Sequence, residues 1–314
     1  MASFIVRRIA SMLPVLLLVS FAAFSLIWLV PGDAAVVILG PDVDKATVEQ
    51  LRKSLGLDRS LPAQYGTWLG RALTGDLGRS LRDNRPIGAA VLDRLPATVE
   101  LSALAMLVSL ALGIPAGIIT ATRRGTWIDM LGSVVSLGGI SMPNFWLGIL
   151  LILTVSLMLG WLPPSGYVPL RESVRANLEL MLMPSVTLGL ALAATVARQT
   201  RSSVLDVLDL DYVRTARAKG AREGRVIGVH VLKNALIPVV TVVGLQVGRL
   251  AGGAVITETI FGIPGVGRLA VDSLLSRDFP VIQAVVLLMA VAVVLSNLVV
   301  DVVYAYLDPR IRYG

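Results

Sequence analysis

Few residues in this 314-residue sequence could carry out chemistry. It has no cysteine and a single histidine, His230, so neither thiol chemistry nor a histidine metal cluster is available. No G-x-x-x-x-G-K-[ST] motif is present to cradle the phosphates of ATP. Gly262, Gly265 and Gly267 do not have the dinucleotide-binding spacing and follow an apolar helix, so they predict a tight external turn. We expect no catalytic residue, metal site or cofactor site in this chain.

Polar residues inside long apolar stretches are candidates for a translocation pathway. Arg249 lies midway along such a stretch, where a charged side chain is costly unless it faces a partner or a water-filled cavity. It could bind a carboxylate of a transported molecule, or it could pair with a carboxylate or carbonyl of a neighbouring helix. Glu258, Asn297 and Asp301 lie nearer helix ends, from which side chains can snorkel toward water. We include Glu258 and Asn297 with Arg249 as pathway candidates.

The most distinctive polar segment is Asp211–Gly220, which reads DYVRTARAKG. It lies within residues 198–235, which hold about eight basic residues, and basic loops between apolar spans face the cytoplasm. An apolar helix stripe is predicted at Val204, Leu208 and Tyr212, and a basic face at Arg214, Arg217 and Arg225. Gly220 should end the helix. One face can then rest on the membrane domain while the other binds a soluble partner or, alternatively, only anionic lipid.

The composition places these residues in a membrane protein. The chain is 55% hydrophobic and 16% charged, whereas a soluble domain carries about 25% charged residues. Apolar stretches predict an all-α fold with about six transmembrane helices: Ile9 to Val30, Thr98 to Ala121, a single tilted crossing within Ile128 to Leu162, Leu180 to Ala197, Leu236 to Ile260, and Val281 to Tyr306. Pro143 should break the third stretch after a short embedded or interfacial helix.

Basic residues at alternate ends of these spans fix the orientation. Arg7 and Arg8 precede the first span, and Arg123 and Arg124 follow the second, which places both positions on the cytoplasmic side. An even number of crossings then leaves both termini in the cytoplasm. The net charge of +7 is explained by these flanks and loops, so nucleic acid is not an expected partner.

The polar region between the first two spans is predicted to be a small helical cap outside the membrane. A helix over Lys45 to Leu55 should end at Gly56, and Pro62 should open a second helix. The predicted domains are residues 1–31 (N-terminal tip and first span), 32–96 (cap), 97–307 (membrane core containing the loop 198–235) and 308–314 (cytoplasmic tail).

Several sequence runs resemble a known family. They are Leu55–Ser80 (LGLDRSLPAQYGTWLGRALTGDLGRS), Asp211–Gly220 (DYVRTARAKG), Lys233–Val239 (KNALIPV) and Leu307–Arg312 (LDPRIR). Together they resemble the B-type permease subunit of dipeptide, oligopeptide and nickel ATP-binding-cassette (ABC) importers, a binding-protein-dependent transport inner membrane component. The basic loop resembles the EAA-type coupling loop of these permeases. Only Ala216 and Gly220 keep the generic form of that loop.

The resemblance implies a type I ABC importer permease fold in a prokaryotic inner membrane. It implies a non-catalytic subunit that forms half of the pathway for di- or oligopeptides, although the same type of transporter carries nickel or glutathione. The implied partners are a second homologous permease, two ABC ATPases or one fused ATPase that bind ATP and Mg, and an external substrate-binding protein. Within residues 204–225, the implied ATPase-coupling residues are Tyr212, Val213, Arg214, Thr215, Ala216, Arg217, Ala218, Lys219 and Gly220.

Two other classes of protein fit the sequence less well. A stand-alone ion-coupled carrier usually has inverted repeats and several buried acids near the middle of the bilayer, whereas this chain has one arginine there, Arg249. A membrane enzyme would need clustered acids, bases, nucleophiles or metal ligands near the bilayer surface, and no such cluster stands out.

Overall fold

The computed structural model describes residues 2–28, 36, 43–54, 56 and 58–307, and apart from an isolated bridge between Arg79 and Pro86 this part contains no strand pairing. Its helices are α1 (Ala2–Ser25), α3 (Lys45–Ser54), α4 (Leu61–Leu73), α5 (Ile87–Thr122), α6 (Trp127–Ser141), α7 (Asn144–Leu151), the π-helix η1 (Ile152–Met158), α8 (Val174–Leu208), α9 (Asp211–Ala218), α10 (Glu223–Arg225), the π-helix η2 (Val226–Val231), α11 (Leu232–Phe261), α12 (Val266–Leu275) and α13 (Phe279–Leu307). The predicted all-α fold class is confirmed.

The predicted number of about six crossings lies within the range of five to seven candidate spans in the part of the chain that the structure describes. Five helices are long and apolar enough to span a bilayer: Arg7–Ser25, Ile87–Thr122, Val174–Leu208, Glu223–Gly248 and Phe279–Val302. The pair Trp127–Ser141 and Asn144–Met158, bent by 100° where Pro143 precedes α7, is a sixth candidate, either a broken span or a re-entrant loop. A second bent pair, Gly252–Phe261 with Val266–Leu275, would make seven, but its first half is the end of α11 and we count it there.

Some span boundaries differ from the sequence-based expectation. Helix α5 begins at Ile87, so residues 87–96, predicted as cap, extend the second span, with Pro96 inside the helix. Helix α8 runs well beyond the predicted Leu180 to Ala197 at both ends. Hydropathy marks only the part of a helix that lies in hydrocarbon, whereas internal hydrogen bonds let the helix continue into polar surroundings. The predicted end of the first span, Val30, and the predicted tail, 308–314, lie outside the described residues.

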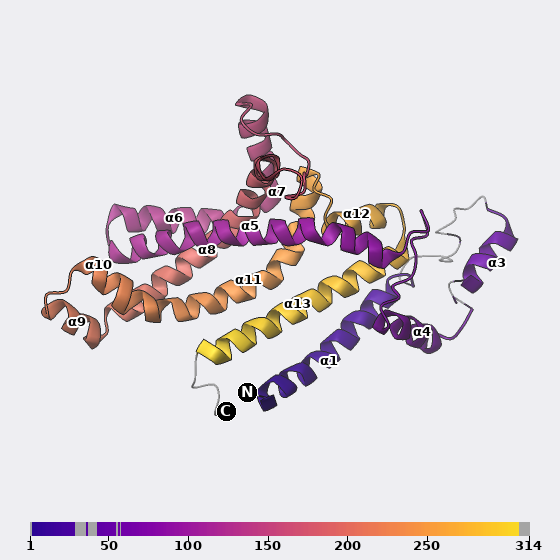
Figure 1. Ribbon diagram of the computed structural model, residues 1–314, viewed down its shortest axis with the longest axis horizontal. Helices are drawn as coiled ribbons and strands as arrows, with labels where there is room; N and C mark the ends of the chain where they lie inside the picture. The colour runs from indigo at the N-terminus through magenta and orange to yellow at the C-terminus, as the bar shows by residue number, and fades with distance from the viewer. Residues whose placement is uncertain (1, 29–35, 37–42, 55, 57, 308–314) are drawn as a thin grey trace.

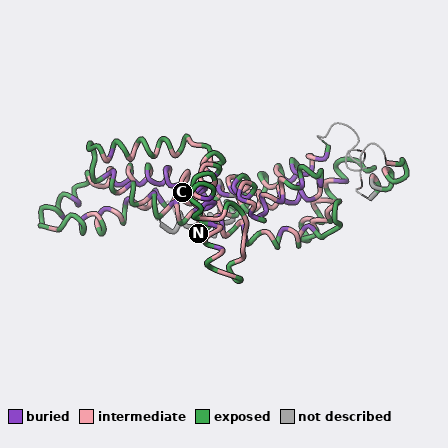
Figure 2. The backbone as a smooth tube through the Cα atoms, turned by 90° about the horizontal axis from the view of Figure 1, so that it is seen from above, coloured by how far each residue is buried: buried purple, intermediate pink, exposed green. Residues whose placement is uncertain are grey.

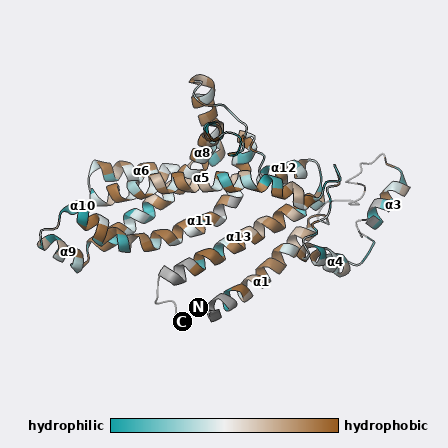
Figure 3. Cartoon of the chain, viewed as in Figure 1, coloured by the Kyte–Doolittle hydropathy of each residue, from teal (hydrophilic) through white to brown (hydrophobic). Residues whose placement is uncertain are grey.

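The elements lie between two opposite ends of an elongated molecule (Figure 1). Helices α9 and α10 lie at one end, and α3, α4 and α12 lie toward the other, while α7 projects sideways from the bundle. The start of α1 and the end of α13 point toward the α9 end. Hydrophobic residues cover the long helices, and hydrophilic residues gather in α3 and in the α9–α10 region (Figure 3). We call the end with α3, α4 and α12 the cap end, and the opposite end, with α9 and α10, the α9 end.

Helices α5 and α8 pack closely along their length, and this contact depends on glycine. A Cβ at Gly117 would lie 2.5 Å from Cβ of Thr200 and 2.6 Å from the carbonyl oxygen of Ala197. A Cβ at Gly189, on the other helix, would lie 2.7 Å from the carbonyl oxygen of Ala105. Both distances are too short for any side chain, so the two backbones can approach only because these positions are glycine. The α5–α8 pair is therefore the fixed centre of the bundle.

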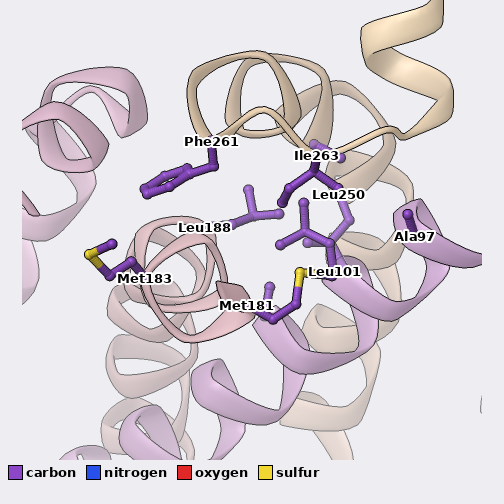
Figure 4. Packing of buried hydrophobic residues seen from close by; sticks show 10 residues of the cluster. Ala97, Leu101, Met181, Met183, Leu188, Leu250, Phe261 and Ile263 are labelled. Carbon is purple, nitrogen blue, oxygen red and sulfur yellow. The ribbon is translucent and has the colours of Figure 1, made fainter. Parts of the chain in front are cut away.

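Buried clusters lie toward each end of this pair. Toward the cap end, side chains of α5, α8 and α11 meet, as Figure 4 shows: Ala97, Leu101, Met181, Met183, Leu188, Leu250, Phe261 and Ile263. At the α9 end, a second cluster contains Ala121, Val204, Val213, Ala216, Val226, Val231 and Ala235. We call this second group the inner cluster. Buried residues follow the middle of the molecule, whereas its extremities are exposed (Figure 2).

The cap is fixed to both the first and the last span. Helix α4 has proline in its first turn, as predicted, and its Tyr65 ring lies 5.5 Å from Phe21 of α1 between centroids, with an interplanar angle of 83°. The Tyr65 hydroxyl is 2.8 Å from Oγ of Ser20. On the other side, Oγ of Ser80 donates to Oδ2 of Asp278 at 2.6 Å, just before α13. The predicted end of α3 is also seen, since Gly56 has φ +68°.

Replacement of Gly117 by alanine should destabilise the protein. The added methyl group would overlap Thr200 and the backbone of α8, and overpacking of this kind costs about 1–3 kcal/mol. The matched control is Gly88→Ala in the same helix, where nothing lies within 4 Å of the added Cβ. Thermal unfolding of the purified proteins in detergent should show a lower midpoint for Gly117→Ala only, and equal midpoints would contradict the close α5–α8 contact.

Candidate functional site

The basic segment forms a separate short helix. Helix α8 ends at Leu208, Asp209 and Leu210 lead out of it, and α9 covers Asp211–Ala218. The predicted continuous stripe through Val204, Leu208 and Tyr212 is therefore wrong, because the first two residues belong to α8 and Tyr212 belongs to α9. The predicted basic face is also divided, since Arg225 lies on α10. The break turns α9 away from the axis of α8, to the extremity of the molecule (Figure 1).

Helix α9 has one packed face and one exposed face. Val213 is fully buried and Ala216 is 9% exposed, and both belong to the inner cluster with residues of α5, α8 and η2. The exposed positions are Asp211, Tyr212, Arg214, Thr215, Arg217, Ala218, Lys219 and Gly220, and Asp211 pairs with Arg214 at 3.3 Å. The sequence-based expectation that this segment has one packed side and one free side holds for α9 itself. The free side is mainly basic.

Hydrogen bonds fix the C-terminal end of α9. Gly220, at φ +78°, donates from its amide to the Arg217 carbonyl at 2.9 Å, and the Ala221 amide donates to the Ala216 carbonyl at 3.2 Å. These two bonds form a Schellman motif, which requires the left-handed conformation that glycine adopts without strain. The predicted stop at Gly220 is confirmed by this geometry.

Side chains connect α9 to the segment that follows it. The Tyr212 hydroxyl donates to the His230 carbonyl at 3.2 Å and accepts from the amide of Asn234 at 2.8 Å. The guanidinium of Arg217 donates to both carboxylate oxygens of Glu223, at 2.6 and 3.2 Å. This hydrogen bonding to Glu223 raises the pKa of Arg217. Helix α9 is thus held to η2, α10 and the start of α11 as well as to the inner cluster.

An ion pair near the α9 end was not expected from the sequence. Nε and Nη2 of Arg201 on α8 donate to Oδ1 and Oδ2 of Asp129 on α6, at 2.7 and 2.9 Å. Asp129 is 8% exposed and also accepts from the Gly125 amide at 3.1 Å. A bidentate pair of this kind fixes the relative positions of the two helices. The signal in the sequence was a lone acid at the start of the apolar stretch that begins at Ile128.

Glu258 is engaged in the interior at the cap end. It has no exposed surface, its Oε1 accepts from Oγ1 of Thr98 at 2.6 Å, and its Oε2 accepts from the Arg268 amide at 2.9 Å. Oγ1 of Thr98 accepts in turn from the Val266 amide at 2.8 Å. Glu258 therefore does not snorkel to water. Its contacts support a structural role, joining α5 and α11 to the N-terminus of α12, where a carboxylate is favoured.

The predicted glycine turn is built around this carboxylate. Gly262 ends α11 in the left-handed conformation at φ +67°, and Gly265 is the N-cap residue of α12. A Cβ at Gly265 would lie 2.1 Å from Cδ of Glu258. Next to the turn, the Tyr167 hydroxyl donates to Oε2 of Glu100 at 2.9 Å, and burial together with this bond raises the pKa of Tyr167 to about 12. The turn is a packing feature that closes the cap end of the bundle.

Among the described residues, Asn297 and Asp301 have contacts separate from those of Glu258. Arg249 lies on α11, but its side chain is outside the described part of the structure. Asn297, on α13, is half-buried beside Gly248, where a Cβ would lie 3.6 Å from its Oδ1. Asp301 forms an ion pair with Arg8, which ties the end of α13 to the start of α1. Among the residues described, no group of three or more His, Asp or Glu could hold a metal ion.

Removal of the Glu258 carboxylate should loosen the start of α12. Glu258→Ala would leave the Thr98 hydroxyl and the Arg268 amide without their partner, which costs about 1–3 kcal/mol for buried groups. Hydrogen–deuterium exchange should therefore become faster at residues 266–268. The control is Glu179→Ala, which breaks an exposed ion pair with Arg175 and should leave this exchange unchanged. Undiminished protection in Glu258→Ala would rule out the capping role.

The chain matches two families of transport membrane components along nearly its whole length. Residues 113–313 match the family described as binding-protein-dependent transport system inner membrane component, and residues 1–102 match the N-terminal family of the same membrane components. The glutathione transport system permease protein GsiC of Escherichia coli K12 is 44% identical over 313 residues, and both chains are covered completely. The dipeptide transport system permease protein DppB of Alkalihalophilus pseudofirmus is 41% identical over 333 residues, again with complete coverage of both.

A solved structure shows the same fold at low identity. It is a chain of the MetNI methionine ABC transporter in an inward-facing conformation, with a TM-score of 0.60 and 16% identity. The match covers 71% of this chain and 99% of that one. These similarities agree with the apolar spans of the chain and with the expected permease architecture. The chain belongs to the binding-protein-dependent transport system inner membrane components, and it is a multi-pass permease subunit of an ABC importer.

Proposed function

We propose that this permease imports peptides and that the exposed face of α9 is the surface on which a cytoplasmic ATPase acts. The observation that supports it most is the division of α9 into a basic exposed face and a face packed in the inner cluster. A helix that only lay on anionic lipid would need an apolar face turned to the membrane, whereas the apolar face of α9 is already covered by protein.

The energy for transport comes from other subunits in this proposal. The sequence has no phosphate-binding loop, so ATP and Mg bind to two ABC ATPase subunits or one fused ATPase, and the chain itself is not catalytic. A second, homologous permease completes the pathway, and an external binding protein delivers the substrate. The α9 end faces the cytoplasm because it carries the basic segment. The start of α1 and the end of α13 point the same way, which supports the proposal that both termini are cytoplasmic.

The contacts of α9 suggest how a movement of the ATPase reaches the membrane spans. The inner cluster joins α9 to α5 through Ala121, to α8 through Val204 and to the start of α11 through Ala235. The hydrogen bonds of Tyr212 with the His230 carbonyl and the Asn234 amide hold α9 to the neighbouring η2 and α11. A push on α9 therefore displaces several spans together, as rigid-body rocking between inward- and outward-facing states requires.

The peptide assignment follows the named relatives. DppB is named a dipeptide permease and GsiC a glutathione permease, and glutathione is itself a small peptide. Nickel transport is the alternative carried over from the family resemblance. Identification of the binding protein and of its bound ligand in the intact purified complex would decide between these substrates. A bound metal ion with no peptide would contradict the peptide assignment.

Substitution of Arg217 should uncouple ATP hydrolysis from uptake. Arg217→Ala removes an exposed cation from α9 together with its bonds to Glu223, while Val213 and Ala216 still hold the helix in place. We expect the peptide transported per ATP hydrolysed by the reconstituted complex to fall at least about fivefold, a usual size for coupling between sites. Arg175→Ala, an exposed arginine on the far end of α8, is the control. Unchanged coupling in Arg217→Ala would refute the role of α9.

A second prediction concerns Arg249, which we propose binds the carboxylate of the transported peptide. Its position on α11, where a charged residue needs a partner or water, supports this role. Wild-type vesicles should prefer peptides with a free C-terminus to amidated ones, and Arg249→Ala should reduce that preference about tenfold, the usual worth of a charged hydrogen bond. Arg249→Lys should retain part of it. An unchanged preference in Arg249→Ala would assign the residue to helix packing.

A further inference from the structure

A basic cavity lies between the cap and the ends of α1 and α13. Its volume is about 630 Å³. Apolar lining comes from Phe24 and Ile27, at the end of α1, and from Pro280, at the start of α13. The other side is formed by α4 and by the turn that follows it, and includes Trp68. The cavity therefore combines the outer ends of two membrane spans with a polar external segment.

Positive charge is in excess in this cavity. Among the residues that the structure describes, its lining includes Lys53, Arg59, Arg71 and Arg79, and one carboxylate, Asp76. Oδ1 of Asp76 already accepts from the Gly78 amide at 3.0 Å. Within the part of the cap that the structure describes, no ion pair is formed by Lys53, Arg59 or Arg71. Like charges gathered in this way repel one another, so an anion bound among them would be stabilised.

The surroundings of the cavity indicate which anion fits. The part of α1 that precedes Phe24 exposes large apolar side chains, including Leu17 (53% exposed), Leu18 (71%) and Phe21 (55%). Acyl chains lying along these residues would bring a lipid headgroup to the level of Phe24 and Ile27. Trp68 is the type of residue that marks the membrane–water interface, and basic pockets beside transmembrane helices bind anionic headgroups.

We infer that this cavity binds the phosphate group of an anionic phospholipid from the outer leaflet. The arginines and Lys53 neutralise the phosphodiester, and Trp68 with the end of α1 contacts the glycerol region. A lipid bound here touches α1, α4 and α13 together, and so helps to hold the cap against the first and last spans. This site is separate from α9 and from Arg249, and its occupancy does not depend on the substrate or on the ATPase.

Charge substitution tests the site directly. The intact transporter, with its partner subunits, is placed in nanodiscs of phosphatidylglycerol and phosphatidylcholine and then purified. The lipids that remain bound are quantified by mass spectrometry. Wild type should retain phosphatidylglycerol selectively. The double variant Arg59→Gln/Arg71→Gln should retain about 25-fold less, since each surface charge contributes about fivefold to anionic lipid binding.

Two matched double variants control for charge and folding. Arg59→Lys/Arg71→Lys keeps the charge and should retain the lipid, whereas Arg171→Gln/Arg175→Gln removes two exposed charges elsewhere at the cap end and should have no effect. Undiminished phosphatidylglycerol in Arg59→Gln/Arg71→Gln would overturn the proposal. Displacement of the lipid by millimolar inorganic phosphate would assign the cavity to a soluble anion instead. Displacement by the external binding protein would assign it to acidic side chains of that partner.

Discussion

The close approach of α5 and α8 is the constraint on which the rest of the structure depends. Gly117 and Gly189 allow their backbones to touch, and each helix reaches both buried clusters. Toward the cap end α5 supplies Thr98, the partner of Glu258, and at the α9 end it supplies Ala121 to the inner cluster. A change at one end of this pair is therefore connected through a rigid contact to the other end. The length of the two helices is comparable to the distance between the two faces of the membrane that a transporter must connect.

Much of the fold could be predicted from local signals in the sequence. Apolar stretches of about 20 residues gave the crossings, because hydrocarbon thickness sets their length. Single residues placed the turns: Pro62 opens α4, Pro143 precedes the bend between α6 and α7, and Gly220 and Gly262 end helices in the left-handed conformation. Each of these signals acts through the backbone of its own segment, so no knowledge of the tertiary structure was needed.

The features that could not be predicted depend on residues far apart in the chain. The break between Leu208 and Asp211 follows from packing of Val213 and Ala216 against other helices, which overrides the helical spacing of Tyr212 with α8. The pair of Asp129 with Arg201 joins residues 72 positions apart, and the bond between Thr98 and Glu258 spans 160. The burial of Glu258 was not predicted because a residue near the end of a membrane helix can reach water with its side chain. In the structure, α12 folds back over Glu258 and covers it.

The arrangement of α1 has a consequence for how the protein is made. Its carbonyl at Phe24 accepts from Gln283 at 2.9 Å, so the first span packs against a helix synthesised 259 residues later. At ribosomal speeds of about 5–20 residues per second, the first span waits roughly 10 to 50 s in the bilayer for this neighbour. Its exposed apolar residues suit it to wait in lipid until α13 is synthesised and packs against it.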